Sequence, residues 1–253
     1  MRRPIPVVAA LLATALLAAG TARAITYGDP DGTAHPFVGL VALYHGGVYK
    51  GRCSGALITP TVVLTAAHCI VETGADRARI YLDPTVTDDL DASIGGFPGK
   101  PIAHPAFTTL DTLPQTSDVA VVLLDNPVSL PTYGSLAPVG ALDGMRGDFL
   151  DVVGYGLQGV KPKILDEKTR FAAQPRILRL NGKNTAGWNV KTTNNRRTGG
   201  TCFGDSGAPV MLTGTNMIVA VNSFGKNDKC KGQDFSYRVD TSYAQDWLAG
   251  YIR

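Results

Sequence analysis

Ser206 lies in the stretch Thr-Cys-Phe-Gly-Asp-Ser-Gly-Ala-Pro, which runs from residue 201 to residue 209. A serine hydroxyl attacks a carbonyl carbon only when a base takes its proton and nearby donors stabilise the resulting oxyanion. Gly204 allows the backbone to approach a substrate closely, so the backbone N–H groups of Gly204 and Ser206 could bind one oxygen. The segment therefore predicts a nucleophile with its oxyanion hole attached.

A base for this serine can be found among the histidines, all of which precede it. The four histidines are His35, His45, His68 and His104. His68 follows the apolar run 62–64, as expected at the end of a buried strand, whereas the other three have no catalytic context. Asp118 opens the apolar run 119–124, where a charge needs a partner, and a carboxylate can orient an imidazole. His68 and Asp118 are therefore the candidate base and its orienting group.

The order of these residues separates the classes of hydrolase. An α/β-hydrolase needs its histidine after the serine, and a subtilisin needs an aspartate before the histidine, where only Asp29 and Asp31 occur. His68, Asp118 and Ser206 follow the chymotrypsin order instead. With the histidine segment Thr-Ala-Ala-His-Cys and the serine segment in this order, residues from about 25 to 253 resemble the trypsin/chymotrypsin-like serine endopeptidases. Within this family, the sequence most resembles small secreted bacterial members.

The resemblance implies hydrolysis of peptide bonds through an acyl-enzyme. Ser206 would attack, His68 would act first as base and then as acid, and Asp118 would orient His68. The N–H groups of Gly204 and Ser206 would bind the oxyanion. Two alternatives are an esterase on the same scaffold and a catalytically weak or inactive binding protein. The expected partners are protein or peptide substrates, and a monomer is expected.

The first 24 residues have the features of a signal peptide. Arg2 and Arg3 precede an apolar stretch from residue 5 to residue 19, and Ala22-Arg23-Ala24 is an Ala-x-Ala cleavage signal. The apolar stretch is too short for a comfortable membrane span, so a secreted product without a membrane anchor is expected. Removal takes away three of the 24 Lys and Arg residues and no acid, leaving 21 basic against 21 acidic residues. The charge of the mature chain therefore gives no indication of a nucleic acid or membrane partner.

Cleavage after Ala24 would make Ile25 the new N-terminus. In the family that the chain resembles, a freed isoleucine or valine pairs its ammonium with the aspartate before the serine, which is Asp205 here. The resemblance thus implies that signal peptidase itself creates the active form. The departure from the family pattern is the pair Thr26-Tyr27, where relatives have smaller residues.

The four cysteines of an exported chain can form two disulfides, and the sequence alone allows three pairings. The resemblance implies Cys53 with Cys69, beside the histidine, and Cys202 with Cys230, beside the substrate pocket. No Cys-x-x-Cys spacing suggests a metal, and no cofactor is expected. Four aspartates occupy the region where relatives carry a calcium loop, but their spacing favours an ordinary acidic loop: Asp83, Asp88, Asp89 and Asp91.

The residues that would select the substrate side chain are also implied by the resemblance. Gly200 falls at the base of the pocket, six residues before the serine, so the aspartate that selects Lys and Arg is missing there. Ser223 and Gly225 would pair with the substrate backbone. Asp234 could supply the missing negative charge from the opposite wall, giving a preference for Arg or Lys. If Asp234 instead faces solvent, the open pocket would suit large apolar side chains.

Short apolar or alternating runs separated by turn residues predict an all-β chain. The runs lie at 38–44, 56–58, 62–65, 79–82, 119–124, 149–154, 176–180, 209–212 and 217–222. The resemblance implies two packed antiparallel six-stranded β-barrels, at about 25–135 and 136–240, joined near 127–138. A C-terminal helix is expected at about 241–253, from the spacing of Tyr243, Trp247 and Tyr251. The basic stretch 161–197 is interpreted as solvated loops rather than as a recruiting surface.

Overall fold

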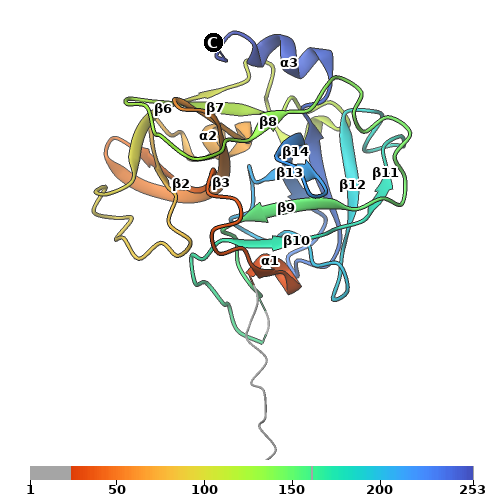
Figure 1. Cartoon of the computed structure of the whole chain (residues 1–253), viewed down its shortest axis with the longest axis horizontal. Helices are drawn as coiled ribbons and strands as arrows, with labels where there is room; N and C mark the ends of the chain where they lie inside the picture. The colour runs from red at the N-terminus through yellow and green to blue at the C-terminus, as the bar shows by residue number, and fades with distance from the viewer. Residues whose placement is uncertain (1–23, 161, 253) are drawn as a thin grey trace, which may run out of the picture.

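The computed structural model describes residues 24–160 and 162–252 (Figure 1). The predicted signal peptide, apart from Ala24, lies outside the described residues. Within these ranges no helix is both long and apolar enough to cross a membrane.

Six antiparallel strands close the first barrel in the order β2-β3-β4-β7-β6-β5. Their bounds are Val38–His45 (β2), Val48–Thr59 (β3), Val62–Thr65 (β4), Arg77–Tyr81 (β5), Phe97–Ala103 (β6) and Ala120–Leu124 (β7). All four residues of β4 and seven of the eight in β2 are buried, in agreement with the apolar runs that predict these strands. The ends of β4 and β7 lie side by side, because Thr65 pairs with Ala120. This pairing brings the segments of His68 and Asp118 together.

Nine strands of the described residues form a second sheet in the order β1-β10-β9-β13-β14-β15-β12-β11, with β8 added in parallel to β14. The first five are Asp29–Pro30 (β1), Ser135–Leu136 (β8), Leu150–Gly154 (β9), Phe171–Ala173 (β10) and Ile177–Arg179 (β11). The others are Asn189–Asn194 (β12), Pro209–Leu212 (β13), Met217–Gly225 (β14) and Gly232–Arg238 (β15). The all-β prediction with two packed β-structures is confirmed. The second structure is a half-barrel sheet, in which a bridge between Phe149 and Arg176 links the beginnings of β9 and β11.

The N-terminal segment belongs to the second sheet and not to the first barrel, where the sequence places it. Strand β1 pairs with β10, and the preceding irregular turn α1 (Ala24–Tyr27) also lies beside β10 (Figure 1). Ile25 is fully buried in the second core with Phe171 and Leu150. Burial of this apolar side chain explains why the segment crosses to the second sheet.

Two short helices flank the first barrel. Helix α2 (Ala67–Thr73) is not predicted from the sequence, because seven residues give too little periodicity, and it ends at Gly74 in the left-handed conformation. The C-terminal helix α3 (Ser242–Leu248) is confirmed but shorter than expected. Tyr243 and Trp247 of α3 pack on His104, at ring-centroid distances of 5.3 and 4.9 Å. A single 3₁₀ turn, η1 (Leu110–Thr112), lies between β6 and β7.

Arg170 links the two halves of the molecule. Its side chain is only 1% exposed, and its Nε donates to an Asp31 carboxylate oxygen at 2.9 Å. Its Nη1 donates to the carbonyl oxygens of Val38 and Leu82 in the first barrel. One member of the basic stretch 161–197 is thus a buried structural cation rather than part of a solvated loop.

Candidate active site

His68 is held by elements on both sides. It is the second residue of α2, directly after β4, and the Cys53–Cys69 disulfide ties the same turn to β3. The structure contains this disulfide and also Cys202–Cys230, the pairing that the resemblance implies. The loop that Cys53–Cys69 closes contributes about 3 kcal/mol to the stability of the folded chain, on a chain-entropy argument.

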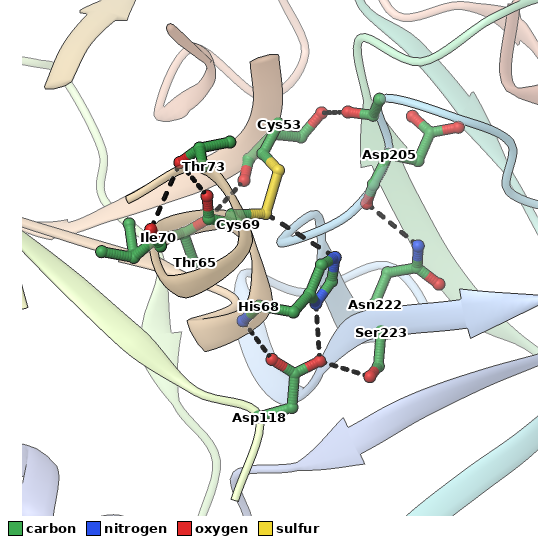
Figure 2. Close-up of a disulfide and its surroundings, with 12 residues drawn as sticks. Cys53, Thr65, His68, Cys69, Ile70, Thr73, Asp118, Asp205, Asn222 and Ser223 are labelled. Atoms are coloured by element: carbon green, nitrogen blue, oxygen red, sulfur yellow. Dashed lines mark hydrogen bonds and ion pairs between the residues drawn. A yellow bond between two sulfur atoms is a disulfide. The ribbon is translucent and has the colours of Figure 1, made fainter. Parts of the chain in front are cut away.

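Asp118 fixes the position and tautomer of His68. One carboxylate oxygen accepts from the His68 backbone N–H at 2.8 Å, and the other lies 2.8 Å from Nδ1 (Figure 2). Burial alone would lower the pKa of His68, but the attraction and hydrogen bond of Asp118 outweigh it and raise the pKa. The pKa of Asp118 is lowered in turn, because His68 outweighs the burial of this fully buried carboxylate. A proton on Nδ1 leaves Nε2 as the basic nitrogen.

Ser206 and His68 line the same cavity. No direct hydrogen bond joins their side chains in the described part of the chain, and His68 Nε2 lies 3.8 Å from Cys69 Sγ. Catalytic hydrogen bonds are often long in unliganded enzymes and shorten when substrate binds. The structure therefore brings together His68, Asp118 and Ser206, and leaves the histidine–serine hydrogen bond to form with substrate.

Ser54 positions the nucleophile segment, and the sequence gives no sign of this role. Its backbone N–H donates to the Ser206 carbonyl at 2.7 Å, and its hydroxyl donates to the Gly204 carbonyl at 2.9 Å. Gly204 has φ 94°, a left-handed value that favours glycine. Within residues 24–160 and 162–252 the N–H groups of Gly204 and Ser206 donate to no protein acceptor. Two donors beside the serine hydroxyl are thus available to a substrate oxygen.

Ser223 supports Asp118 from the second sheet. Its hydroxyl donates to the same Asp118 oxygen that faces Nδ1 of His68 (Figure 2). The sequence predicts only that Ser223 pairs with the substrate backbone, and its hydrogen bond to Asp118 is a second role that the structure reveals. Its backbone lies at an irregularity between β14 and β15, where Asn222 and Phe224 are paired but Ser223 is not.

Replacing Ser223 with alanine is expected to lower kcat by about three- to tenfold, because a hydrogen bond to a charged group is lost. The carboxylate becomes a stronger partner for His68, so the pKa of His68 rises further and the acid limb of kcat moves to higher pH. A pH profile of kcat checks this, with Ser223→Thr as the variant that keeps the hydroxyl. An unchanged acid limb in Ser223→Ala would show that the contact does not tune His68.

Asp205 is fully buried and accepts hydrogen bonds from two backbone N–H groups. These come from Gly156 at 2.8 Å and Cys202 at 2.9 Å. Burial raises the pKa of Asp205 to about 7, and the two hydrogen bonds only partly oppose this. Ile25 is also buried, but its nitrogen is an amide while Ala24 is attached. The Ile25–Asp205 ion pair therefore stays a prediction.

A cavity of about 230 Å³ next to Ser206 corresponds to the predicted substrate pocket. Ser223, Gly225 and Asp234 line it, as the sequence predicts. Gly200 does not: its Cα faces the Asn194 side chain, which takes the space where a side chain at position 200 would lie. The assignment of Gly200 to the pocket base is therefore corrected.

Asp234 is a buried carboxylate in the cavity wall, not a solvent-exposed one. It is 3% exposed and accepts from the Thr201 N–H at 2.7 Å and from Asn194 Nδ2 at 2.9 Å. Burial raises the pKa of Asp234 to about 6 against these hydrogen bonds. Asp234 of β15 is the backbone pairing partner of Gly225 in β14. Strand β14 is the one that would bind the substrate backbone.

The three remaining histidines form hydrogen bonds outside the candidate active site. His35 bonds to Asp31, His45 to the Gly74 carbonyl, and His104 accepts from the Ala106 N–H. Among the described residues, the only group of potential ligand atoms close enough for a metal is Cys53, His68 and Cys69, and both sulfurs are in the disulfide. The four aspartates of the acidic loop do not converge in this way.

A carboxylate-held histidine beside a serine, at the junction of two β-structures, is typical of serine hydrolases of the chymotrypsin type. The trypsin family model matches residues 28–248. The chain therefore belongs to the trypsin family of serine endopeptidases.

Named relatives are distant. Proclotting enzyme of Tachypleus tridentatus is 27% identical, over 87% of this chain and 63% of its own length, so this chain spans less than two thirds of that protein. Brachyurin of Leptuca pugilator is 26% identical, over 78% of this chain and 85% of its own length. The solved structure of HL collagenase has a TM-score of 0.71 and 19% identity, over 90% of this chain and 99% of that chain, and shows the shared fold. The sequence relatives are eukaryotic, so the likeness to small bacterial members is not confirmed.

Proposed function

We propose that this chain is a secreted serine endopeptidase that hydrolyses peptide bonds through an acyl-enzyme. The observation that carries the proposal is the Asp118 carboxylate, which holds His68 through both its backbone and Nδ1 beside the cavity of Ser206. His68 accepts the serine proton as Ser206 attacks, and then donates it to the leaving amine. The N–H groups of Gly204 and Ser206 stabilise the oxyanion.

A fluorophosphonate probe tests this mechanism, because it reacts only with an activated serine. We expect covalent labelling of Ser206 in the wild-type protein and none in Ser206→Ala. Turnover of casein or a peptide amide supports a peptidase, and turnover of simple esters without any peptide turnover identifies an esterase. Folded, oxidised wild-type protein that takes no label contradicts the mechanism and leaves a binding protein.

We further propose that the predicted signal peptide ends at Ala24 and that Ile25 then pairs with Asp205. Two observations support this. Ile25 is already buried in the second core, and Thr26 pairs with Gly200, six residues before the nucleophile. Among the described residues the hydrogen-bond partners of the Asp205 carboxylate are backbone N–H groups, and an ammonium group there would favour its charged form.

The proposed substrate preference is cleavage after Arg or Lys. Asp234 supports it as a buried acceptor in the cavity wall whose charge a guanidinium or ammonium group would neutralise. Asp234→Ala is expected to reduce kcat/KM for an Arg substrate by about 10- to 100-fold, the worth of one hydrogen bond to a charged group. A Phe substrate should be much less affected. A preference for Phe, Tyr or Leu in a peptide library, unchanged in Asp234→Ala, contradicts the proposal.

This preference should depend on pH. A carboxyl with a pKa of about 6 is charged above pH 6 and neutral below it, so the Arg preference is present at neutral pH and decreases as the pH falls through about 6. Protonation of His68 lowers the rate for both substrates, so the Arg/Phe ratio of kcat/KM isolates Asp234. We expect this ratio to fall between pH 7.5 and pH 5 in the wild type, and to be flat in Asp234→Asn.

A further inference from the structure

A row of side chains crosses four neighbouring strands and ends at the cavity. Arg179 pairs with Lys191, Lys191 with Phe235, and Phe235 with Phe224. The Nζ of Lys191 lies over the Phe235 ring, and Arg179 is close enough to repel the charge of Lys191, so these side chains gather on one side of the sheet. The two phenyl rings are stacked at 4.8 Å, and Phe224 lines the cavity beside Ser206.

The charges along this row are all positive. The Nζ atoms of Lys191 and Lys226 lie 5.7 and 5.2 Å from the centroid of the Phe235 ring. We call Arg179, Lys191 and Lys226 the basic row. The pKa of Lys191 is lowered by burial and then by repulsion from Lys226 and Arg179. Across the described ranges, no carboxylate forms a hydrogen bond or ion pair with Lys191 or Lys226.

The surrounding loop adds to this excess of positive charge. The segment 226–231 contains Lys226, Lys229 and Lys231 against a single acid, Asp228. Lys226 and Lys231 both border the cavity. The one acid on the four described strands β11, β12, β14 and β15 is Asp234, whose carboxylate is buried and already bonded to Asn194 and Thr201. Like charges held together without a counter-charge favour an anionic ligand.

The course of a bound peptide can be inferred from β14. A substrate that adds to this strand in the antiparallel direction runs from Gly225 toward Ser223, and so places its N-terminal part beside Gly225 and Lys226. At about 3.3 Å per residue, the fourth to sixth residues before the cleaved bond lie beyond Gly225. Lys226 and Lys191 lie on this side of Gly225, beside the expected position of those substrate residues.

We propose that the basic row binds an acidic segment of the substrate, four to six residues before the cleaved bond. This proposal rests on the proposed peptidase function and adds a class of substrate to it. The row favours a peptide over a free polyanion, because it is continuous with the cavity in which the scissile bond would lie. Exposed ion pairs are individually weak, so the preference arises from several together and is screened by salt.

Three quenched fluorescent peptides test the preference. They share one sequence around the cleaved bond and carry Glu-Glu-Glu, Gln-Gln-Gln or Lys-Lys-Lys at the fourth to sixth positions before it. We expect kcat/KM to be about tenfold higher for the Glu peptide than for the Gln peptide at low salt, mainly through KM. The difference should fall to less than about twofold in 0.5 M NaCl, where the Debye length is only a few Å.

Variants locate the effect. Lys191→Glu with Lys226→Glu should reverse the order of kcat/KM for the Glu and Lys peptides. The control is Lys100→Glu, which reverses an exposed lysine of β6 in the first barrel. A Glu preference that persists in the double variant, or equal kcat/KM for all three peptides in the wild type, overturns the proposal.

Binding to the Ser206→Ala protein separates the row from catalysis. Fluorescence anisotropy should show the Glu peptide bound about tenfold more tightly than the Gln peptide, even if the wild type cleaves neither. Tight binding of dextran sulfate with equal affinity for the Glu and Gln peptides would overturn the proposal in favour of a polyanion site.

Discussion

Replacing Ser206 with alanine is expected to lower kcat for a peptide substrate by about 10⁴- to 10⁶-fold. The variant loses the hydroxyl of Ser206, which lines the same cavity as His68 and is the proposed nucleophile. Binding of substrate should change little, because the contacts of Gly225 and Asp234 remain. Steady-state kinetics, with thermal unfolding to verify the fold, measure both effects.

Two further variants make this experiment decisive. Ser129→Ala, at an exposed serine in the segment that joins the two halves, should keep full activity. His68→Ala combined with Ser206→Ala should be no slower than Ser206→Ala alone, because residues that act as a unit are not additive. If the two losses multiply, His68 and Ser206 do not share one step and the proposed mechanism is wrong.

A mature chain that begins at Ala24 instead of Ile25 is expected to be about 10²- to 10³-fold less active. Asp205 is fully buried, and breaking a buried ion pair costs about 3–5 kcal/mol. In the proposed pair, one extra residue would move the charged nitrogen away from Asp205, and the segment that carries Gly204 and Ser206 would lose its support. Kinetics of the two chains, prepared by cleavage of matched fusion proteins, measure the loss.

The same pair should set the alkaline limit of activity. In the proposed pair the Asp205 carboxylate favours the charged form of the Ile25 ammonium, so the pair should be lost as alkaline pH removes the ammonium proton. The Ile25 chain should therefore lose activity at alkaline pH, and Asp205→Asn should be poorly active throughout. A chain starting at Ala24 with full activity shows that the pair is not needed.

The sequence predicts the parts of this molecule whose residue types are chemically specific. A serine, a histidine and an aspartate in fixed order, each beside an apolar run, are recognisable without a structure. Strands such as β12, which reads Asn-Val-Lys-Thr-Thr-Asn, carry no clear alternation and form because β11 and β15 supply their hydrogen-bond partners. Helix α2 is also missed from the sequence. Its stability comes from packing and from the disulfide, and not from a periodic pattern of its own residues.

Pocket residues are only partly predictable from spacing. Counting from the serine finds Gly200, yet a buried Asn194 side chain fills the adjacent space and removes Gly200 from the cavity wall. Asp234 is found by counting from the other end, and its burial depends on pairing with Gly225 across two strands. Contacts between distant strands, such as Ser54 with the nucleophile segment, leave no trace in local sequence.

Ser54 makes the nucleophile depend on both halves of the molecule. It belongs to β3 of the first barrel, yet it holds the carbonyl groups on either side of Asp205 and accepts from the Tyr155 N–H of the second half. Folding of the second half alone therefore leaves the carbonyls of Gly204 and Ser206 without these donors. We therefore expect a chain whose halves have not yet docked to be inactive, and a small molecule that separates the halves should inhibit the enzyme without entering its substrate pocket.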